Sequence, residues 1–247
     1  MKAFWLALAL LSWTIAPALC ESLRIGTEGN YPPFSFLNAD GRLTGFEVDL
    51  GNRLCDIIDA SCEWETMKFG DLVPALLEGR IDAIMASVAI TPERRKHLAF
   101  STRYYSTPIR FIAERNRTLT INPAQLAGLR IGAGKGTIHA DYIARTLSAA
   151  VEPTLYADQS EMLSALISGK LDLVLGDGLA LWNFLNTPQG AAFNWVGNPI
   201  YADEGIGLAL RPADDDLRLR FDGAIDKVLK NGTYLRVNAR YFPFNIY

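Results

Sequence analysis

The chain has 247 residues, of which 49% are hydrophobic, and 24 Lys and Arg stand against 27 Asp and Glu for a formal net charge of −3. No run of basic residues is present that could neutralise a phosphate backbone, so the composition argues against nucleic-acid binding. The length suits one large domain or two modest ones, each with its own core.

The first twenty residues are typical of a secretory signal peptide. MKAFWLALALLSWTIAPALC carries one lysine, then an apolar stretch, then small residues around Ala16 and Ala18. Cleavage after Ala18 or after Cys20 fits the preference for small residues, whereas Leu19 argues against lipidation of Cys20. No later segment is long and apolar enough to cross a bilayer. We therefore expect the mature chain to be exported and soluble.

Two cysteines remain after cleavage behind Cys20, namely Cys55 and Cys62 in the stretch CDIIDASC. In an oxidising compartment such a pair is expected to form a disulfide across a short loop. Loop entropy assigns this bond roughly 2.5 kcal/mol. Two buried free thiols are the alternative, and export favours the disulfide.

The first elements along the chain are a strand, a hairpin and a helix. LRIGT at 23–27 predicts the strand, and the turn-forming residues of NADGRLTG at 38–45 predict the hairpin. GFEVDLGNRLCDIID predicts a helix because its apolar residues recur at helical spacing. These residues are Phe46, Leu50, Leu54, Ile57 and Ile58.

The sequence then repeats itself. LRIG at 23–26 returns at 129–132, and ALLEGRIDAIMAS at 75–87 aligns without gaps to ALISGKLDLVLGD at 165–177. Each copy of the second pair indicates a helix end, a glycine stop, an apolar strand and a small or polar residue at its tip. Near-continuous apolar strands are typical of parallel sheets covered on both faces. Chance similarity of common α/β pieces is one explanation; two echoes in the same order favour duplication of an α/β lobe.

Further details support the repeat. In the first copy Leu72, Val73, Leu76 and Leu77 share one helical face, and in the second Met162, Leu163, Leu166 and Ile167 do the same. Gly79 and Gly169 stand where left-handed C-caps are expected, and Asp158 with Glu161 fits a capping box. Ligands of open α/β sheets bind beyond the carboxyl ends of the strands. Two such lobes face to face would therefore enclose one cleft, with the second LRIG building the other wall.

Six motifs spread over nearly the whole mature chain carry a resemblance to a known family. They are LRIGTEGNYPPFSF, GFEVDLGNRLC, GRIDAIMASVAITPERRKHLAFS, LRIGAGKGT, GKLDLVLGD and NGTYLRVNARYF. In this order they resemble the periplasmic solute-binding proteins of ABC importers for polar amino acids, family 3. Within that family the chain is similar to the branch that binds lysine, arginine, ornithine, histidine or opines.

The resemblance implies an α/β fold with two lobes that close on a ligand like a hinged trap (type II). Each lobe is a mostly parallel sheet flanked by helices. Residues 21–108 and 204–247 would form the first lobe and residues 109–203 the second, with crossing strands near 109–113 and 204–208. It also implies a periplasmic monomer without a cofactor, which delivers a small cationic ligand to a membrane permease.

For the ligand's α-carboxylate the resemblance implies Arg94 and Ser87. Thr91 suits an N-cap and Pro92 the first helical position, so backbone N–H groups, a helix N-terminus and a guanidinium would converge on an anion. An Arg–carboxylate pair is often bidentate and therefore orients the ligand as well as holding it. The alternative for Arg94 is a solvated arginine on the helix surface.

Asp177 stands at the position that echoes Ser87, and in similar proteins it meets the α-ammonium group. Burying both charges together lets each compensate the lost hydration of the other. A turn aspartate before Gly178 is the alternative. Tyr31 and Phe69 are expected as aromatic side walls, unless they are plain core residues.

Glu28 is the expected specificity residue. A carboxylate at the far end of the pocket favours a cationic ligand tip and disfavours neutral or acidic ones, which would leave a desolvated charge unpaired. An exposed loop glutamate is the alternative.

Some positions depart from the pattern of basic amino-acid binders. Ala86 and Ala89 replace hydroxyl residues of the first lobe, and Ile138 stands where a threonine is common in the second. The pattern Gly136-Thr137-Ile138-His139 is similar to receptors for opines, which are N-substituted derivatives of arginine or lysine. His139 would either contact the ligand or cap the following helix.

The sequence lacks the motifs of several other functional classes. GAGKGT at 132–137 misses the spacing of a phosphate-binding loop, the two histidines are far apart and form no metal cluster, and no nucleophile elbow is present. We therefore predict a non-enzymatic binding component of an importer for a basic amino acid, with an opine derivative as the second candidate. An exported cyclohexadienyl dehydratase, which uses cleft carboxylates on the same fold, is the enzymatic alternative.

Overall fold

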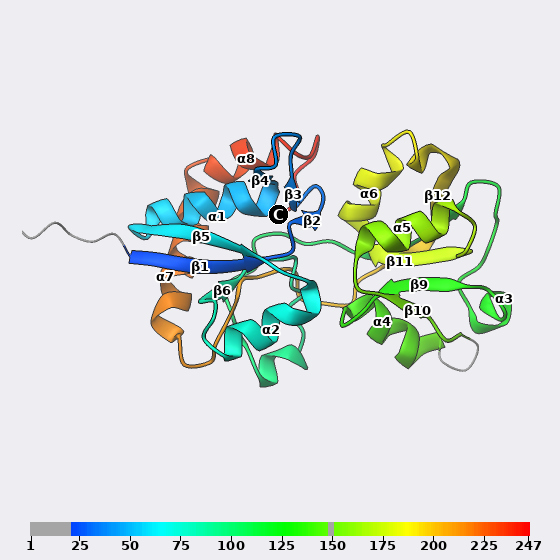
Figure 1. The fold of residues 1–247 in the computed structure, drawn as a ribbon, viewed down its shortest axis with the longest axis horizontal. Coiled ribbons are helices and arrows are strands. Elements are labelled where there is room, and N and C mark those ends of the chain that lie inside the picture. Colours follow the sequence, from blue (N-terminus) through cyan, green and yellow to red (C-terminus); the bar gives the residue numbers. More distant parts are fainter. Residues whose placement is uncertain (1–20, 148–150) are drawn as a thin grey trace, which may run out of the picture.

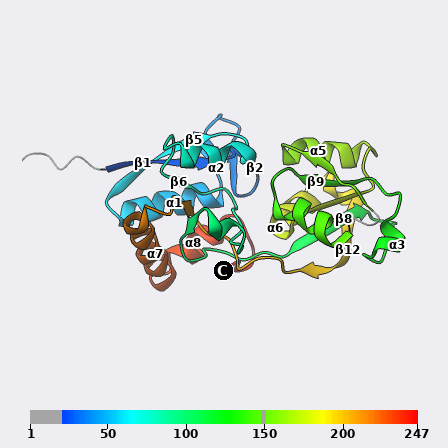
Figure 2. The same ribbon diagram turned by 90° about the horizontal axis from the view of Figure 1, so that it is seen from below.

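The computed structural model describes residues 21–147 and 151–247, and the expected signal peptide lies outside these residues. Two lobes lie side by side, each built around its own five-stranded sheet (Figure 1). Seen from below, the lobes are joined by thin connections that run past the C-terminal end of the chain (Figure 2). The fold is the predicted two-lobed α/β architecture.

The first sheet has the order β5-β1-β6-β13-β7. Three strands are parallel to one another: β1 (Glu21–Thr27), β5 (Ala60–Thr66) and β6 (Ala83–Ile84). β13 (Ala209–Leu210) is antiparallel to both β6 and the edge strand β7 (Ala99–Phe100). The first lobe therefore combines a parallel half with an antiparallel half.

Helices cover both faces of this sheet. α1 (Phe46–Ile57), α7 (Asp215–Lys230) and α8 (Thr233–Asn238) share one face, and α2 (Phe69–Leu77) packs on the other (Figure 1). The predicted hairpin forms within the small sheet of β2 (Asn30–Tyr31), β3 (Ser35–Leu37) and β4 (Leu43–Thr44). The helix expected from residue 46 onwards is α1.

The second sheet has the order β10-β9-β11-β8-β12. Here β10 (Thr154–Tyr156), β9 (Ile131–Gly134) and β11 (Leu173–Asp177) are parallel. β8 (Ile109–Glu114) is antiparallel to β11 and to the edge strand β12 (Phe193–Ile200). This pattern of parallel and antiparallel neighbours is the same as in the first sheet.

The helical segments of the second lobe are short. They are α3 (Pro123–Leu126), α4 (Ile138–Tyr142), the π-helical η2 (Ile143–Leu147), α5 (Gln159–Ile167), α6 (Gly178–Leu185) and the 3₁₀ turn η3 (Gly190–Ala192). α5 and α6 each bury an apolar face in a cluster beneath β11. Among residues 21–147 and 151–247, no helix combines the length and the hydropathy that a membrane span requires.

The echoes of the sequence occupy equivalent places in the two sheets. Ile25 of β1 pairs with Ala83, and its counterpart Ile131 of β9 pairs with Leu173. The glycines that end the two helices also correspond: Gly79 after α2 and Gly169 after α5 have φ of +73° and +69°. Matching registers and caps in both copies support the predicted duplication.

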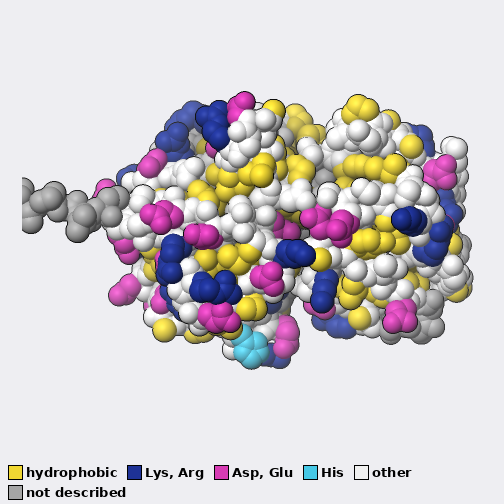
Figure 3. All heavy atoms as spheres, viewed as in Figure 1, with side chains coloured by type: hydrophobic (Ala, Val, Ile, Leu, Met, Phe, Trp, Pro, Cys, Tyr) yellow, Lys and Arg dark blue, Asp and Glu magenta, His cyan; other side chains and the backbone are white. Residues whose placement is uncertain are grey.

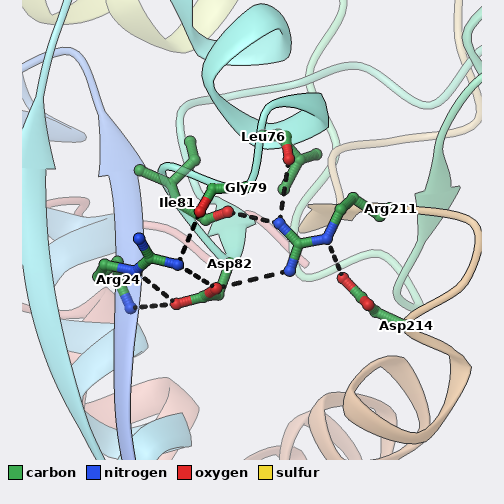
Figure 4. A network of polar contacts seen from close by, with 7 residues as sticks. All are labelled: Arg24, Leu76, Gly79, Ile81, Asp82, Arg211 and Asp214. Atoms are coloured by element: carbon green, nitrogen blue, oxygen red, sulfur yellow. Dashed lines mark hydrogen bonds and ion pairs between the residues drawn. The ribbon is translucent and has the colours of Figure 1, made fainter.

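A duplicated ion pair reinforces this correspondence. Arg24 donates from Nε and Nη2 to the two oxygens of Asp82 at 3.0 and 2.8 Å, and Arg130 does the same to Asp172 at 2.9 and 3.1 Å. In each lobe a second arginine reaches the same carboxylate. Figure 4 shows the first copy, in which Arg211 also donates to the backbone oxygens of Leu76 and Ile81. The counterpart in the second lobe is Arg117.

The helical faces predicted for α2 and α5 are confirmed only in part. Leu72 and Leu76 are buried, as are Met162 and Leu166. Leu77 and Ile167 are about half exposed, at 52% and 47%. The apolar stripe is thus narrower than the sequence indicated, and its last member faces outward in both copies.

The predicted position of the first crossing was wrong. Residues 109–113 lie inside β8, which is hydrogen-bonded on both sides within the second sheet. The connection precedes them, where Tyr105 bridges to Ile206 of the second connection. The boundaries 108/109 and 203/204 between the lobes stay a prediction.

The predicted disulfide between Cys55 and Cys62 is present, with an S–S distance of 2.04 Å. Cys55 belongs to the last turn of α1 and Cys62 to β5. The bond therefore ties this helix to the edge strand of the first sheet.

Candidate functional site

A cavity lies between the two lobes. Ten of the eleven expected site residues line it: Glu28, Tyr31, Phe69, Ala86, Ser87, Ala89, Arg94, Ile138, His139 and Asp177. Gly136 does not line the cavity, but its carbonyl oxygen accepts a hydrogen bond from Arg94 at 3.2 Å. Acidic and basic side chains gather where the lobes meet on the face shown in Figure 3. Whether these residues contact a ligand stays a prediction.

The cavity walls come from the carboxyl ends of parallel strands. Glu28 directly follows β1, Ser87 follows β6 after a short extension, and Asp177 is the last residue of β11. Lys135 follows β9, and Asp158 follows β10 by two residues. In open α/β sheets this edge is the usual ligand side. The fold thus directs polar residues from both sheets toward one space.

Arg94 is the guanidinium of the site. Its Nη1 donates to the carbonyl oxygen of Ala89 at 3.0 Å, and its Nη2 reaches across to Gly136 of the other lobe. The guanidinium carbon lies 5.7 Å from the ring centre of Phe69. Burial lowers the pKa of Arg94, yet a guanidinium stays charged at neutral pH. These two hydrogen bonds use two of its five N–H donors.

The helix expected to begin at Pro92 is absent. Only a 3₁₀ turn, η1 (Arg94–Lys96), forms there. Thr91 still accepts a hydrogen bond from the Arg94 backbone N–H at 3.2 Å, so its capping role is kept without a helix. A turn of three residues supplies no appreciable macrodipole. Positive potential at this wall therefore comes from the guanidinium itself.

Asp177 combines a structural role with a place in the cavity. It is the N-cap of α6, and its Oδ1 accepts hydrogen bonds from the N–H groups of Leu179 and Ala180 at 2.8 and 2.9 Å. Thr107 donates to the same oxygen at 3.3 Å. Burial raises the pKa of Asp177 to about 7. A nearby cation would restore its charge at neutral pH.

Glu28 lies half-buried just beyond β1. Burial raises its pKa to about 8, with further increases from the charges of Glu47 and Asp158. A carboxyl group in such a place is poised to take a cation, because a positive neighbour lowers its pKa and stabilises its ionised form.

The two aromatic residues are held by different contacts. Tyr31 stacks on Phe34 with ring centres 5.7 Å apart, and Phe69 begins α2 beneath Arg94. Both are only partly buried and line the cavity, so neither is a plain core residue.

Ser87 has an unusual backbone for a residue with a side chain, with φ of +53°. Its N–H donates to Oε1 of Glu47 at 2.7 Å. Its hydroxyl is buried and forms no hydrogen bond of regular geometry among the described residues, although it lies close enough to the Glu47 carboxyl to lower the pKa of that group. A buried hydroxyl beside a cavity is suited to a ligand oxygen.

The structure excludes one of the two roles considered for His139, and its contact with a ligand stays a prediction. Thr137 is the N-cap of α4, since its Oγ1 accepts from the N–H of Ala140, so His139 is not the cap. Burial, with a smaller contribution from the charge of Arg94, lowers the pKa of His139 to about 3. It therefore presents a neutral imidazole to the cavity.

Sequence reasoning missed several lining residues. Asp158 was recognised only as a helix cap; it does cap α5, and it also accepts a 2.7 Å hydrogen bond from Asn30 across the cleft. Lys135 lies in the loop after the second LRIG, and this loop corresponds to the loop of Glu28 after the first LRIG. The repeat could therefore have indicated Lys135 as a lining residue. Thr107 and Asp203 belong to the connections between lobes, for which the repeat offers no counterpart. Among the described residues no group of acidic, His or Cys side chains is arranged to hold a metal ion.

The chain is similar to known proteins over nearly its whole length. The profile of the bacterial extracellular solute-binding proteins, family 3, matches residues 23–244. The L-arginine-binding protein of Pseudomonas aeruginosa is 38% identical over 98% of this chain and 95% of its own. The lysine/arginine/ornithine-binding periplasmic protein of Escherichia coli is 35% identical over 100% of this chain and 99% of its own. An ancestral arginine-binding protein solved with arginine superposes with a TM-score of 0.84 at 28% identity, over 90% of this chain and 98% of that one.

Proposed function

Because the chain belongs to the bacterial extracellular solute-binding proteins of family 3, we propose that it captures a basic amino acid between its lobes and delivers it to the permease of an ABC importer. The observation that carries the proposal is that Arg94 and Asp177, which come from different lobes, line one cavity together with Glu28. A basic amino acid carries one anionic and two cationic groups. Among the residues that line the cavity, Arg94 offers a cation for the first, and Glu28 and Asp177 offer carboxyls for the other two.

The α-carboxylate is assigned to Arg94. Its guanidinium is already fixed by the carbonyl oxygens of Ala89 and Gly136, so little rotamer freedom remains to be lost on binding. Its remaining donors suit a bidentate contact to a carboxylate. The buried hydroxyl of Ser87 lies in the same cavity and suits a second contact to the ligand.

The two cationic groups are assigned to the two carboxyls. Asp177 takes the α-ammonium, and Glu28 takes the ammonium or guanidinium tip. Burial disfavours the ionised form of both carboxyls. A cationic ligand tip stabilises the ionised form of Glu28, whereas a neutral or acidic tip does not. Micromolar to nanomolar affinity corresponds to about 8–12 kcal/mol, a range that three charge pairs and two aromatic walls can supply after ordering costs.

Closure of the lobes on the ligand follows from where these groups lie. Arg94 contacts Gly136 across the cleft, and Asn30 contacts Asp158 and Ser160 in the same way. A ligand that joins Arg94 to Asp177 adds charge-assisted bonds to this set and so favours the closed arrangement. The protein acts in this proposal as a periplasmic monomer that needs no cofactor and catalyses no reaction.

Two other ligands fit particular observations. The small side chains of Ala86 and Ala89 leave room that an N-substituted arginine, such as octopine, would fill. The carboxyls of Glu28 and Asp177, with pKa values of about 8 and 7, would also suit acid–base chemistry on a cyclohexadienyl acid. The opine hypothesis and the dehydratase hypothesis are each tested by a separate measurement in the same experiment.

Titration calorimetry with arginine, ornithine, lysine, histidine, octopine and the neutral arginine isostere citrulline tests the proposal, beside a turnover assay with prephenate. We expect tight binding of at least one basic amino acid, weak binding of citrulline and no turnover. If octopine binds most tightly, the opine hypothesis is correct. If prephenate is turned over, the protein is an enzyme of the dehydratase type and the proposed binding function is wrong.

Two variants and a control test the assignments. Arg94→Ala should abolish detectable binding, and Glu28→Gln should weaken arginine far more than citrulline. Arg95→Ala is the matched control, because Arg95 faces Glu204 at 3.0 Å outside the cavity. Unaltered arginine affinity in Glu28→Gln would show that Glu28 does not set specificity.

A further inference from the structure

Asp203 is an acidic residue of the cavity that neither the repeat nor the family motifs indicated. It lies in the second connection between the lobes, after β12 and before β13. Its Oδ1 accepts a hydrogen bond from the N–H of Gly205 at 2.8 Å. Its Oδ2 is shielded from solvent and has no hydrogen-bond partner among the described residues. A buried carboxylate oxygen without a donor calls for a ligand or another explanation.

The backbone around Asp203 is fixed on both sides. The N–H of Glu204 donates to the carbonyl oxygen of Ile90 at 3.0 Å, and the N–H of Ile90 donates to that of Gly205 at 2.8 Å. Ile206 then bridges to Ala89 and to Tyr105. The position of the Asp203 side chain is therefore set by a hydrogen-bonded segment that links both connections.

The neighbouring acidic residue points elsewhere. Glu204 is exposed and forms a 3.0 Å ion pair with Arg95 outside the cavity, whereas Asp203 lines the cavity. Two adjacent carboxylates thus have different surroundings, one paired at the surface and one unpaired inside. The contrast offers a natural control for the role of the inner one.

The charges near Asp203 identify the end of the cavity to which it belongs. Arg94 and Asp177 are the charged groups with which it interacts, whereas Glu28 interacts with Glu47 and Asp158. Burial raises the pKa of Asp203, against the Gly205 hydrogen bond and the charge of Arg94, which lower it. Asp203 therefore shares the end assigned to the ligand's α-carboxylate and α-ammonium groups.

We propose that Asp203 is a further ligand-binding residue, whose Oδ2 accepts a hydrogen bond from the α-amino group of the ligand. The proposal rests on the proposed function and deepens it, because it makes a protonated α-amine the feature that the site selects. Asp177 has only its Oδ2 to offer the amine, since its Oδ1 already accepts three hydrogen bonds. An ammonium group has up to three N–H donors and can serve both carboxylates at once.

The decisive comparison uses two ligands that differ only in this amine, arginine and 5-guanidinopentanoate, which is arginine without its α-amino group. Asp203→Asn removes the charge but keeps an oxygen that can accept from Gly205, so the connection should fold as before. We expect Asp203→Asn to weaken arginine about tenfold to a hundredfold, as for loss of a charged hydrogen bond. Its effect on 5-guanidinopentanoate should stay within about twofold, an estimate from the near-additivity of uncoupled groups.

Calorimetry or competition binding measures both ligands on the wild type, on Asp203→Asn and on the control Glu204→Gln. The control should change neither affinity. Equal losses for the two ligands in Asp203→Asn would show a structural role, and an unchanged arginine affinity would show no contact; either result overturns the proposal. Failure of the wild type to bind any basic amino acid would instead overturn the proposed function, and the Asp203 assignment with it.

Discussion

The carboxylate of Glu47 holds the backbone of Ser87 in place, through a 2.7 Å hydrogen bond from the Ser87 N–H to Oε1. Glu47 is fully buried in the first turn of α1, and Tyr104 donates its hydroxyl to the same oxygen. Ser87 adopts a positive φ that residues with side chains rarely take. Such conformations persist where the surroundings over-determine them, often at ligand sites.

Removing this support should misplace the wall to which the ligand's α-carboxylate is assigned in the proposed function. We expect Glu47→Ala to lower arginine affinity at least tenfold and the free energy of unfolding by about 1–3 kcal/mol, because it strands the Ser87 N–H and the Tyr104 hydroxyl. Glu47→Gln keeps an acceptor oxygen and should retain most of the affinity. Calorimetry and urea unfolding measure the two effects. Asp49→Asn, which removes another carboxylate of α1 that pairs with Arg240 at 2.7 Å, is the control. Wild-type affinity in Glu47→Ala would contradict this role.

Three buried carboxyl groups predict how stability without ligand depends on pH. Burial raises the pKa of Glu28 to about 8 and those of Glu47 and Asp177 to about 7. Their unfolded values are lower, so between pH 4 and 8 the folded state binds more protons than the unfolded state. These three groups therefore make stability fall as pH rises through this window, and His139, whose lowered pKa acts in the opposite sense below about pH 6.5, offsets only part of the fall. Thermal unfolding from pH 4.5 to 8.5 should show the fall, and Glu28→Gln should flatten its upper part. A rise in stability toward pH 8 would contradict these pKa directions.

Binding should couple to the same protons. A cationic ligand favours the ionised forms of Glu28 and Asp177, so their pKa values drop and protons leave on binding. Near pH 7 we expect net proton release, and affinity for arginine should increase from pH 5.5 to 8. Calorimetry in buffers of different ionisation enthalpy counts the protons. Glu28→Gln should reduce the release, and proton uptake by the wild type would refute the coupling.

The repeat made much of this architecture predictable. LRIG and the GRIDAIMAS-like segment fall on central parallel strands. Burial on both faces requires apolar runs in such strands, so the strands and their ends could be inferred from the sequence. Glu28, Ser87 and Asp177 follow such strands, and the cavity brings them together.

The parts that failed depend on tertiary context. The sequence of residues 109–113 is compatible with a strand of either lobe. Only the pairing of this strand with β11 and β12 assigns it to the second lobe. Thr91 and Pro92 form a proper helix start in sequence, but the chain returns to β7 after a single turn. Asp203 lies in an irregular connection, where no periodicity marks an inward side chain.

The disulfide should contribute stability without affecting the site. Cys55 lies in the last turn of α1, at the end opposite Glu47, and is bonded to Cys62 of β5. Replacing both cysteines by alanine should lower the free energy of unfolding by roughly 2.5 kcal/mol through loop entropy. Urea unfolding measures this loss, and arginine affinity of the folded variant should be unchanged. A lost affinity would mean that the bond also holds the N-terminal turn of α1.

The duplicated ion pairs allow a matched comparison of the two lobes. Asp82 receives Arg24 and Arg211, and Asp172 receives Arg130 and Arg117. Both carboxylates are largely buried, with side-chain exposures of 19% and 14%. Asp82→Asn and Asp172→Asn should therefore each lower the free energy of unfolding by about 1–3 kcal/mol, because each weakens a bidentate hydrogen bond between an arginine and a carboxylate.

The two losses should add in the double variant, since the sites belong to different lobes and share no partner. Hydrogen bonds from Arg130 lower the pKa of Asp172 to about 2, so its stabilising effect is present above pH 4 and is lost as pH falls through 2. Urea unfolding at pH 7 measures the single and double variants, with Asp56→Asn as a surface control, because Asp56 pairs with Arg53 where both side chains are about 60% exposed. Equal stability of wild type and Asp172→Asn at pH 7 would show that the second bidentate hydrogen bond is only a consequence of packing, and the equivalence of the lobes would then not extend to their energetics.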